Sequence, residues 1–495
     1  MPLLTFALSA TASLVRSQTP IDSSFLSMVP AAFPVGFDLM TEGKRQYAAY
    51  YDSAHNMTVA MRNPGVSPWI KQVLPSKVGW DSHNYLTMAL DGKGHLHVSG
   101  NMHAVPLIYF RTSSPYDITT LKRVPNLVST TRETSVTYPE FVKGPLGDLY
   151  FLYRQGLSGD GLWYLDKFND LAESWSALYG GAALFGNLDR AGASVNAYFT
   201  GPQMGPDGRF HIFFMWRDNG DASTCHDAGY IRTVSNNLDA WESVDGKPLT
   251  LPITLNSPAT TFDSVAIKQG LINMGFSIGF DSRNRAILSY HKYDTAGISQ
   301  IYNARYDSTA KRWQVVKASP WKNYRWEFGG GGTIASEIAV GPVTLKQGKL
   351  TETWRHSQFG SGEWILDEKT LLPVDSTKLL LKIAASETQH AVAEDLIQKS
   401  QWDRGMGDDP YVRYRMRWQT QGPNRDVQPD TIPPDSRLEV VAYRFTEPQA
   451  LFPVPSDRRS RYPDEMNRVM RRWFPYQGEM FDLRGRQSAG IFRKN

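Results

Sequence analysis

A short phrase, a tight turn followed by a strand of alternating side chains, recurs five times along this chain of 495 residues. The copies span residues 91–103, 144–154, 206–217, 281–291 and 346–355. Their turn residues are 53, 61, 76 and 64 positions apart and are Gly94, Gly147, Gly208, Asn284 and Gly348. Glycine and asparagine suit tight hairpin turns, so each copy predicts a β-hairpin. A stack of unrelated β-sandwiches would not repeat one phrase, and the recurrence therefore predicts repeated β units of one kind.

A second phrase ends a strand-turn unit with a tryptophan, at Trp175, Trp241 and Trp313. These residues are 66 and 72 positions apart, and residues 235–241 are a degenerate version of the Asp-box turn of sialidase-like propellers. All-β repeats of this kind predict a β-propeller. At about 60 residues per blade, residues 24–447 would form seven four-stranded blades in a single toroidal domain. Helix signals are few, and residues 391–400 are the best candidate.

The two ends of the chain are expected to lie outside this domain. Residues 1–19 are apolar and small like a signal peptide, which predicts a secreted protein. Residues 448–495 are rich in Pro and Arg and are expected to form a C-terminal tail packed on the propeller.

Composition excludes several function classes. Hydrophobic residues make up 41% and charged residues 21%, as in a soluble globular protein. The 53 Lys and Arg against 49 Asp and Glu give a net charge of +4, too small for a nucleic-acid binder built on bulk charge. The absence of an 18-residue apolar run argues against a membrane partner. Cys225 is the only cysteine, so an intrachain disulfide is impossible. We expect a monomer.

Basic and imidazole side chains finish the repeated strands. Equivalent strand ends of a propeller gather around the central channel, so these side chains should form a ring. They are His103, Arg154, Arg217, His291 with Lys292, and Arg355 with His356. Exposed strand ends are often polar, but chance would mix in acids, Ser and Asn. The ring therefore favours an anionic ligand.

The carboxylates near these strand ends do not form an obvious catalytic pair. Asp160, Asp218 and Asp294 follow the strands, but a glycoside hydrolase wants two acids set up as acid and base. A cationic site with His and Tyr better suits β-elimination at a uronic acid. There an Arg neutralises the carboxylate and stabilises the enolate-like intermediate, while a His or Tyr moves the proton.

Four motifs in order resemble the β-propeller polysaccharide lyases, which include the ulvan lyases and the fungal L-rhamnose-α-1,4-D-glucuronate lyase. The motifs are residues 81–85, 99–103, 137–141 and 152–161, and later matches extend the resemblance over about residues 75–365. The resemblance implies a seven-bladed propeller with its site on one face. It also implies that His83, His103, Tyr138 and Arg154 are catalytic, with Arg154 neutralising the uronate carboxylate. We assign substrate binding to Asn101, Arg217, His291 and Lys292.

The expected function is a secreted polysaccharide lyase that cleaves L-rhamnosyl-(1→4)-D-glucuronate linkages of the gum-arabic or ulvan type and leaves a 4,5-unsaturated uronate. The partner is an anionic polysaccharide or oligosaccharide that contains uronic acid. In D-glucuronate the C5 hydrogen and the C4 oxygen leave from the same side, so one group, such as Tyr138, can serve as base and then as acid. In L-iduronate two groups are needed. The residues leave open which of His83, His103 and Tyr138 is the base.

Two other functions stay open at this point. Glu140 near Tyr138 is compatible with a sialidase-like hydrolase that uses a Tyr–Glu nucleophile pair, although Pro139 between them is awkward. The second is a non-catalytic glycan-binding propeller. The plain alternatives for the residues themselves are a satisfied buried histidine at His83 and a core aromatic at Tyr138.

No cofactor is expected for catalysis. His211, Cys225 and His226 are the candidate ligands of a structural zinc or calcium ion, with Asp227 as a further donor. The resemblance is to a family in which some members carry such an ion. The alternative for His211 is packing, because it lies in the middle of a predicted strand.

Overall fold

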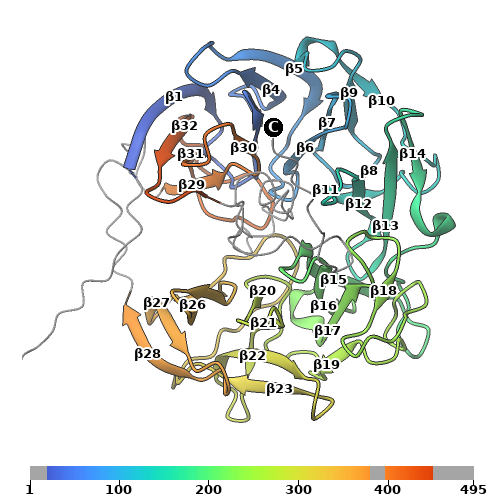
Figure 1. Ribbon diagram of the computed structural model, residues 1–495, viewed down its shortest axis with the longest axis vertical. Helices are drawn as coiled ribbons and strands as arrows, with labels where there is room; N and C mark the ends of the chain where they lie inside the picture. Colours follow the sequence, from blue (N-terminus) through green and yellow to red (C-terminus); the bar gives the residue numbers. More distant parts are fainter. Residues whose placement is uncertain (1–18, 379–395, 450–495) are drawn as a thin grey trace, which may run out of the picture.

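The chain folds into mainly antiparallel β-sheets arranged around a common centre (Figure 1). The computed structural model describes residues 19–378 and 396–449. Within these residues the helical turns are the three short 3-10 helices η1 (Ile118–Thr120), η2 (Leu178–Gly181) and η3 (Ala222–Thr224). No helix in the described ranges is both long and apolar enough to span a bilayer. The expected all-β class is confirmed.

The strands of the described residues form six hydrogen-bonded sheets, and the first two combine strands from both ends of the described chain. One sheet has the order β1 (Thr19–Val29), β32 (Ser436–Arg444), β31 (Val412–Thr420) and β29 (Ile397–Trp402). The next contains β30 (Met406–Gly407), β2 (Asp38–Gly43), β3 (Arg45–Tyr51), β4 (Asn56–Arg62) and β5 (Ile70–Lys77). The third contains β10 (Leu121–Val124), β9 (Tyr109–Thr112), β7 (Leu96–Gly100) and β6 (Leu86–Leu90).

The middle of the chain forms one ten-stranded sheet. Its main path is β18 (Trp241–Glu242), β17 (Cys225–Thr233), β16 (Phe210–Arg217), β15 (Asn196–Met204), β13 (Asp160–Asn169), β12 (Leu149–Leu157), β11 (Val136–Lys143) and β8 (His103–Val105). Off this path lie β14 (Ser174–Ala177) on β13 and β19 (Thr261–Asp263) on β17. Two antiparallel groups meet in this sheet through one parallel pair, Gly161 with Asn196.

Two further sheets complete the ring. One contains β20 (Ser277–Phe280), β21 (Ala286–Tyr293), β22 (Ser299–Asp307) and β23 (Arg312–Lys317). The other contains β24 (Ile338–Val340), β26 (Lys349–His356), β27 (Gly360–Leu366) and β28 (Pro373–Lys378), with β25 (Thr344–Lys346) on β26. The seven blades stay a prediction, because the pairing yields six sheets.

The repeated turn phrase forms hairpins as expected. All five turn residues have positive φ, at 88°, 94°, 77°, 60° and 74° for Gly94, Gly147, Gly208, Asn284 and Gly348. The three tryptophans of the second phrase lie on β14, β18 and β23, each at an outer strand of its group.

The aspartate of the turn phrase fastens its hairpin. Asp91 accepts hydrogen bonds from the backbone N–H groups of Lys93 and His95, at 3.0 and 2.8 Å, and so closes the turn. Its other carboxylate oxygen pairs with Arg111 at 2.8 Å and with the buried His97 at 3.2 Å. The turn is thereby tied to the strands that follow it. A buried charge is tolerated there because it is paired and hydrogen-bonded.

The core lies between neighbouring sheets. Phe213 on β16 and Tyr290 on β21 are both fully buried, and their ring centroids are 5.7 Å apart. This contact joins the ten-stranded sheet to the next sheet. The first described strand, β1, pairs with the last, β32, so the two ends of the described chain meet in one sheet.

Three sequence-based expectations concern the ends and the one predicted helix. The signal peptide at 1–19 falls almost wholly outside the described residues, and so does the tail after residue 449. The helix predicted at 391–400 is wrong where it can be compared, because residues 397–400 belong to strand β29, which pairs with β31. Tertiary pairing with an existing strand overrides the local helix preference of this segment.

Candidate functional site

A cavity of about 740 Å³ lies where loops and strand ends from several sheets converge. The residues that line it come from segments far apart in the sequence, from residues 82–85 to Pro423. The titratable side chains that line it are His83, Tyr85, Tyr138, Arg217, Arg355 and Lys399. Four of these six are basic or imidazole groups, so the cavity suits an anionic ligand.

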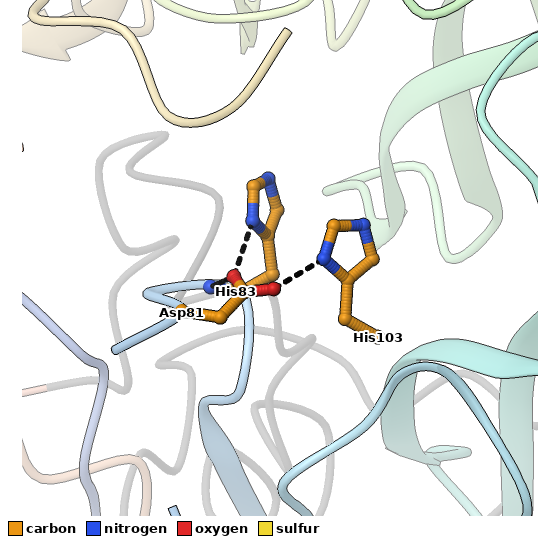
Figure 2. Close-up of side chains that lie close together, drawn as sticks. All are labelled: Asp81, His83 and His103. Carbon is orange, nitrogen blue, oxygen red and sulfur yellow. Dashed lines mark hydrogen bonds and ion pairs between the residues drawn. The ribbon is translucent and has the colours of Figure 1, made fainter. Parts of the chain in front are cut away.

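Two imidazoles share one carboxylate beside this cavity (Figure 2). Nδ1 of His83 lies 2.7 Å from Oδ1 of Asp81, and Nδ1 of His103 bonds to Oδ2 of the same residue. An ionised carboxylate only accepts hydrogen bonds, so Nδ1 of each ring carries a proton. Figure 2 shows the other nitrogen, Nε2, of each ring pointing away from Asp81. Both Nε2 atoms are thus available for a ligand or for proton transfer.

Asp81 is placed by its own turn. Its Oδ1 also accepts the backbone N–H of His83 at 2.8 Å, so the carboxylate folds back over the segment that carries the first histidine. His103 arrives from β8, and the two imidazole centroids are 4.4 Å apart. One short turn and one strand end therefore bring the two rings together.

A second carboxylate, Asp426, also reaches His83. Its Oδ2 lies 3.2 Å from Nδ1 of the histidine. Burial lowers the pKa of His83, but the adjacent Tyr138 and the two carboxylates outweigh it and raise the pKa to about 10. Burial likewise raises the pKa of Asp81, but hydrogen bonds from the histidines hold it well below its usual range. At neutral pH His83 is therefore a cation between anions.

Tyr138 is aimed at the cavity by a β-bulge. Strands β11 and β12 are in register at Thr137, lose register over the next two residues and recover it at Glu140. Tyr138 sits in this bulge with a φ of 57°, which is rare for a residue other than glycine. Pro139 has no backbone N–H to donate and so fits a bulge. The register shift and the positive φ thus accompany the placement of Tyr138 at the cavity wall.

The Tyr138 ring lies among the other predicted catalytic groups. Its centroid is 5.9 Å from that of His83. Its other neighbours are Trp163, stacked at 5.9 Å, and Tyr198, edge-on at 6.2 Å. The guanidinium of Arg154 lies 4.9 Å from its centroid. The phenol is thus held in a rigid aromatic setting beside two positively charged side chains.

Arg154 is placed behind Tyr138 and does not line the cavity. Its side chain is fully buried. Nη1 donates to the hydroxyl of Tyr198 and Nη2 to that of Thr137, both at 3.1 Å. The resemblance implies that this guanidinium binds the substrate carboxylate, whereas in the structure it donates to Tyr198 and Thr137 and lies over the Tyr138 ring.

Room for Arg154 depends on Gly161. A Cβ atom at this position would lie 2.7 Å from Cδ of Arg154, closer than real contacts allow. Gly161 also makes the single parallel pair with Asn196 that joins the two strand groups. The last glycine of the motif at 152–161 therefore has a steric role next to the site.

Arg217 is the guanidinium that does line the cavity. Its Nε donates to the carbonyls of Asn219 and Asp221, and its Nη2 to that of Gly220. These bonds fix the end of β16 and hold the side chain at the cavity wall. Asn101, the other predicted binding residue nearby, is not in the described lining. Its amide donates to Oγ of Ser76 and to the carbonyl of Lys77.

The structure does not bring His291 and Lys292 to the cavity. His291 is buried, 5.2 Å from Trp326 between ring centroids, and burial lowers its pKa to about 4. Successive strand residues face opposite sides, so Lys292 points elsewhere and pairs with Asp263 at 2.6 Å. His356 is likewise buried, with its pKa lowered by burial to about 4. The predicted cationic ring is therefore incomplete on this side.

The predicted metal ligands lie at opposite ends of one strand pair. Cys225 pairs with Arg217, whereas His211 pairs with Arg232. Six residues along a strand correspond to about 20 Å. His211 instead bonds to Asp207 at 2.9 Å, and His226 lies 2.9 Å from Asp218. The expectation of one metal site at His211, Cys225 and His226 is wrong, because strand register separates its members.

Asp81, His83 and His103 are the group in the described ranges whose ligating atoms lie close enough together to hold a metal ion. The same atoms are already satisfied by the hydrogen bonds within the group.

Neither carboxylate that contacts His83 was singled out from the sequence. The sequence offered a clue to Asp81, since this residue begins the motif at 81–85. It offered no clue to Asp426, because this residue lies more than 300 positions from His83 in the sequence.

Comparisons with known proteins agree with this fold. A family profile described as "BNR repeat-containing family member" matches residues 45–321. The crystal structure of polysaccharide lyase Uly1 is similar with a TM-score of 0.56 and 14% identity, over 84% of this chain and 90% of that one. Two structures of a PL25 ulvan lyase, one bound to -[GlcA(1-4)Rha3S]-, each have a TM-score of 0.52 and 14% identity, over 82% and 97%. None of the curated proteins compared with this chain matches it.

Proposed function

The chain belongs to the BNR repeat-containing family, and from that premise we propose that it is a polysaccharide lyase acting on an anionic, uronate-containing polysaccharide by β-elimination. The observation that carries the proposal is the pair of imidazoles on Asp81, beside a cavity lined by Tyr138 and Arg217. The likeness in fold to polysaccharide lyases supports it.

Positive charge at the cavity wall binds the uronate carboxylate. His83 is protonated at neutral pH, since its pKa is raised to about 10, and its Nε2 points away from Asp81. Arg217 adds a second cation. Charge-assisted hydrogen bonds from such groups neutralise the carboxylate and stabilise the enolate-like intermediate that forms when the C5 proton leaves. In this proposal His83 and Arg217 take the role that the family resemblance gives to Arg154.

Tyr138 transfers the proton. Its ring borders the cavity between two cations, a setting that favours its phenolate form. The phenolate removes the C5 proton, the C4–O4 bond breaks as the C4–C5 double bond forms, and the new phenol protonates the departing O4. One residue suffices because both groups leave from the same side in D-glucuronate. His103 holds its Nε2 toward the substrate and orients it.

Arg154 acts on the substrate through Tyr138 and Tyr198. Its fork ties Tyr198 and Thr137, and its charge lies beneath the Tyr138 ring. A buried cation placed there stabilises negative charge on the nearby phenol oxygen. Arg154 is thus a positioning residue in this proposal.

The linkage we propose is L-rhamnosyl-(1→4)-D-glucuronate, in a polymer of the ulvan or gum-arabic type. The ligand bound in one similar structure, -[GlcA(1-4)Rha3S]-, contains the same two sugars. The same-side geometry of D-glucuronate also suits proton transfer by a single residue, Tyr138, at the cavity wall. We further propose a secreted, monomeric protein with a seven-bladed propeller and no cofactor requirement in catalysis.

The proposal is tested by incubating the protein with ulvan and, separately, with gum arabic. We expect one of them to yield oligosaccharides that end in an ultraviolet-absorbing 4,5-unsaturated uronate. Tyr138→Phe keeps the ring and removes the hydroxyl, so it is the matched inactive control. Saturated products from the unmodified protein would contradict the proposal in favour of a hydrolase, and no cleavage of any uronate polymer would favour a glycan-binding propeller.

A further inference from the structure

The connection between β31 and β32 brings a carboxylate to the site from the far end of the chain. Arg425 and Asp426 in this connection both have positive φ, at 52° and 64°. Two successive non-glycine residues in this region carry a backbone cost that the surroundings must offset. Such strain is retained where a fixed side-chain direction is needed.

The surroundings of Asp426 show what this strain fixes. Oδ1 accepts the backbone N–H of Ser82 at 3.2 Å and its hydroxyl at 2.8 Å. Oδ2 accepts the backbone N–H of Thr333 at 2.7 Å and lies 3.2 Å from Nδ1 of His83. Oγ of Ser82 and Oγ1 of Thr333 are 2.6 Å apart. The Asp426 carboxylate therefore joins its own connection to two distant segments, residues 82–83 and Thr333, beside Nδ1 of His83.

Arg425 anchors the same connection without touching the imidazoles. Its Nη1 donates to the carbonyls of Gly329 and Gly331, at 2.8 and 2.9 Å. A Cβ atom at Gly332 would lie 2.6 Å from the carbonyl oxygen of Arg425, so the two loops are in close contact. A substitution at Arg425 therefore measures what anchoring of the connection contributes to activity without a contact to the imidazoles.

We propose that Asp426 is a positioning residue that, together with Asp81, fixes the His83 imidazole with Nδ1 toward the carboxylates and Nε2 toward the substrate. This inference rests on the proposed lyase function and adds to it a residue from the connection between β31 and β32. Asp81 alone is shared between two histidines, so it cannot set the orientation of His83 independently of His103. Asp426 contacts His83 and leaves His103 to Asp81.

The groups that face His83 make the role of Asp426 electrostatic as well as geometric. Asp81 and Asp426 lie at Nδ1, His103 stacks at 4.4 Å, and Tyr138 lies at 5.9 Å between ring centroids. In the unmodified protein two carboxylates, Asp81 and Asp426, accept hydrogen bonds from the two histidines. With Asn at position 426, Asp81 is left as the carboxylate that contacts both histidines, and the positive charge on His83 that stabilises the enolate-like intermediate is weakened.

The test compares Asp426→Asn with Arg425→Ala in the full chain. Misplacing a catalytic group by about 1 Å costs about a hundredfold in rate. We expect Asp426→Asn to lower kcat on the cleaved polymer about tenfold to a hundredfold, with a smaller change in KM. Arg425→Ala should lower the melting temperature and leave kcat within about threefold of the unmodified protein. Should Asp426→Asn not fold, Asp426→Glu moves the carboxylate by one methylene and is expected to show the same split.

A second readout separates this inference from the proposed function. The imidazole nitrogens of His83 are followed by ¹⁵N NMR in the substrate-free protein, with assignment from a His83→Gln variant. Asp426→Asn should shift the His83 nitrogen signals more than those of His103, because Asp426 contacts His83 directly and His103 is reached only through Asp81, whatever the substrate. Unchanged His83 signals, or equal kcat in Asp426→Asn and Arg425→Ala, would overturn the positioning role. Lack of lyase activity in the unmodified protein would overturn only the proposed function.

Discussion

Arg154→Lys tests whether the buried guanidinium acts through the tyrosines. The substitution keeps one positive charge but replaces a planar fork with a single ammonium group. In the structure the fork reaches Tyr198 and Thr137 at the same time, at 3.1 Å each, from a fully buried position. A lysine ammonium can keep one of these hydrogen bonds and must give up the geometry of the other.

The magnitude follows from that lost bond. A hydrogen bond to a charged group contributes about 1.5–3 kcal/mol. One tenfold change in rate corresponds to about 1.36 kcal/mol. The two hydrogen bonds fix Tyr198 and Thr137, the residue before Tyr138, so the loss of one should lower kcat about tenfold to a hundredfold. KM should change little, because Arg154 does not line the cavity.

The assay follows the ultraviolet absorbance of the unsaturated product under initial-rate conditions. Arg132→Lys is the matched control, because Arg132 also lies over a tyrosine ring, that of Tyr164 at 4.6 Å, and pairs with Asp166. It should lose stability and keep its turnover. A normal kcat in Arg154→Lys would refute the reasoning. A raised KM with unchanged kcat would instead place the guanidinium on the substrate carboxylate.

Four further outcomes are expected. Tyr138→Phe should bind substrate with nearly unchanged affinity by calorimetry and lose most of its turnover, and ordinary turnover would move the base to a histidine. Gly161→Ala should cost about 1–3 kcal/mol in denaturant unfolding through overpacking against Arg154, and an unchanged midpoint would contradict the close contact. The pKa of His83 is raised from 6.5 to about 10 on folding, so its stabilisation is complete below pH 6.5 and is lost as the pH rises to 10. The melting temperature should fall across that window, and less so in His83→Gln. Cys225→Ser should leave the metal content measured by mass spectrometry unchanged, and loss of a bound zinc ion would restore the metal site.

The all-β fold could be predicted because its signals are local. A hairpin turn needs residues that tolerate positive φ, and the five turn residues from Gly94 to Gly348 are glycine or asparagine, which do. The number of sheets could not be predicted in the same way. It depends on pairs such as Gly161 with Asn196, which join strand groups that a repeat would keep apart.

The sequence predicted those site residues that lie within a recognisable motif and have side chains suited to proton transfer. His83, His103 and Tyr138 come together as expected. Asp426 could not be found, because its contact with His83 exists only after β31 and β32 complete the ring. The metal prediction failed for a related reason, since His211 and Cys225 are near in sequence but lie at opposite ends of one strand pair.

The proposed function requires that the protein cleave its substrate by β-elimination. The most direct measurement is mass spectrometry of the products after cleavage of ulvan and of gum arabic in ¹⁸O-labelled water. The proposed mechanism predicts an unsaturated uronate at the new non-reducing end and no labelled oxygen incorporated by the cleavage. Products that carry one ¹⁸O atom per cleaved bond, with a saturated uronate, would contradict it.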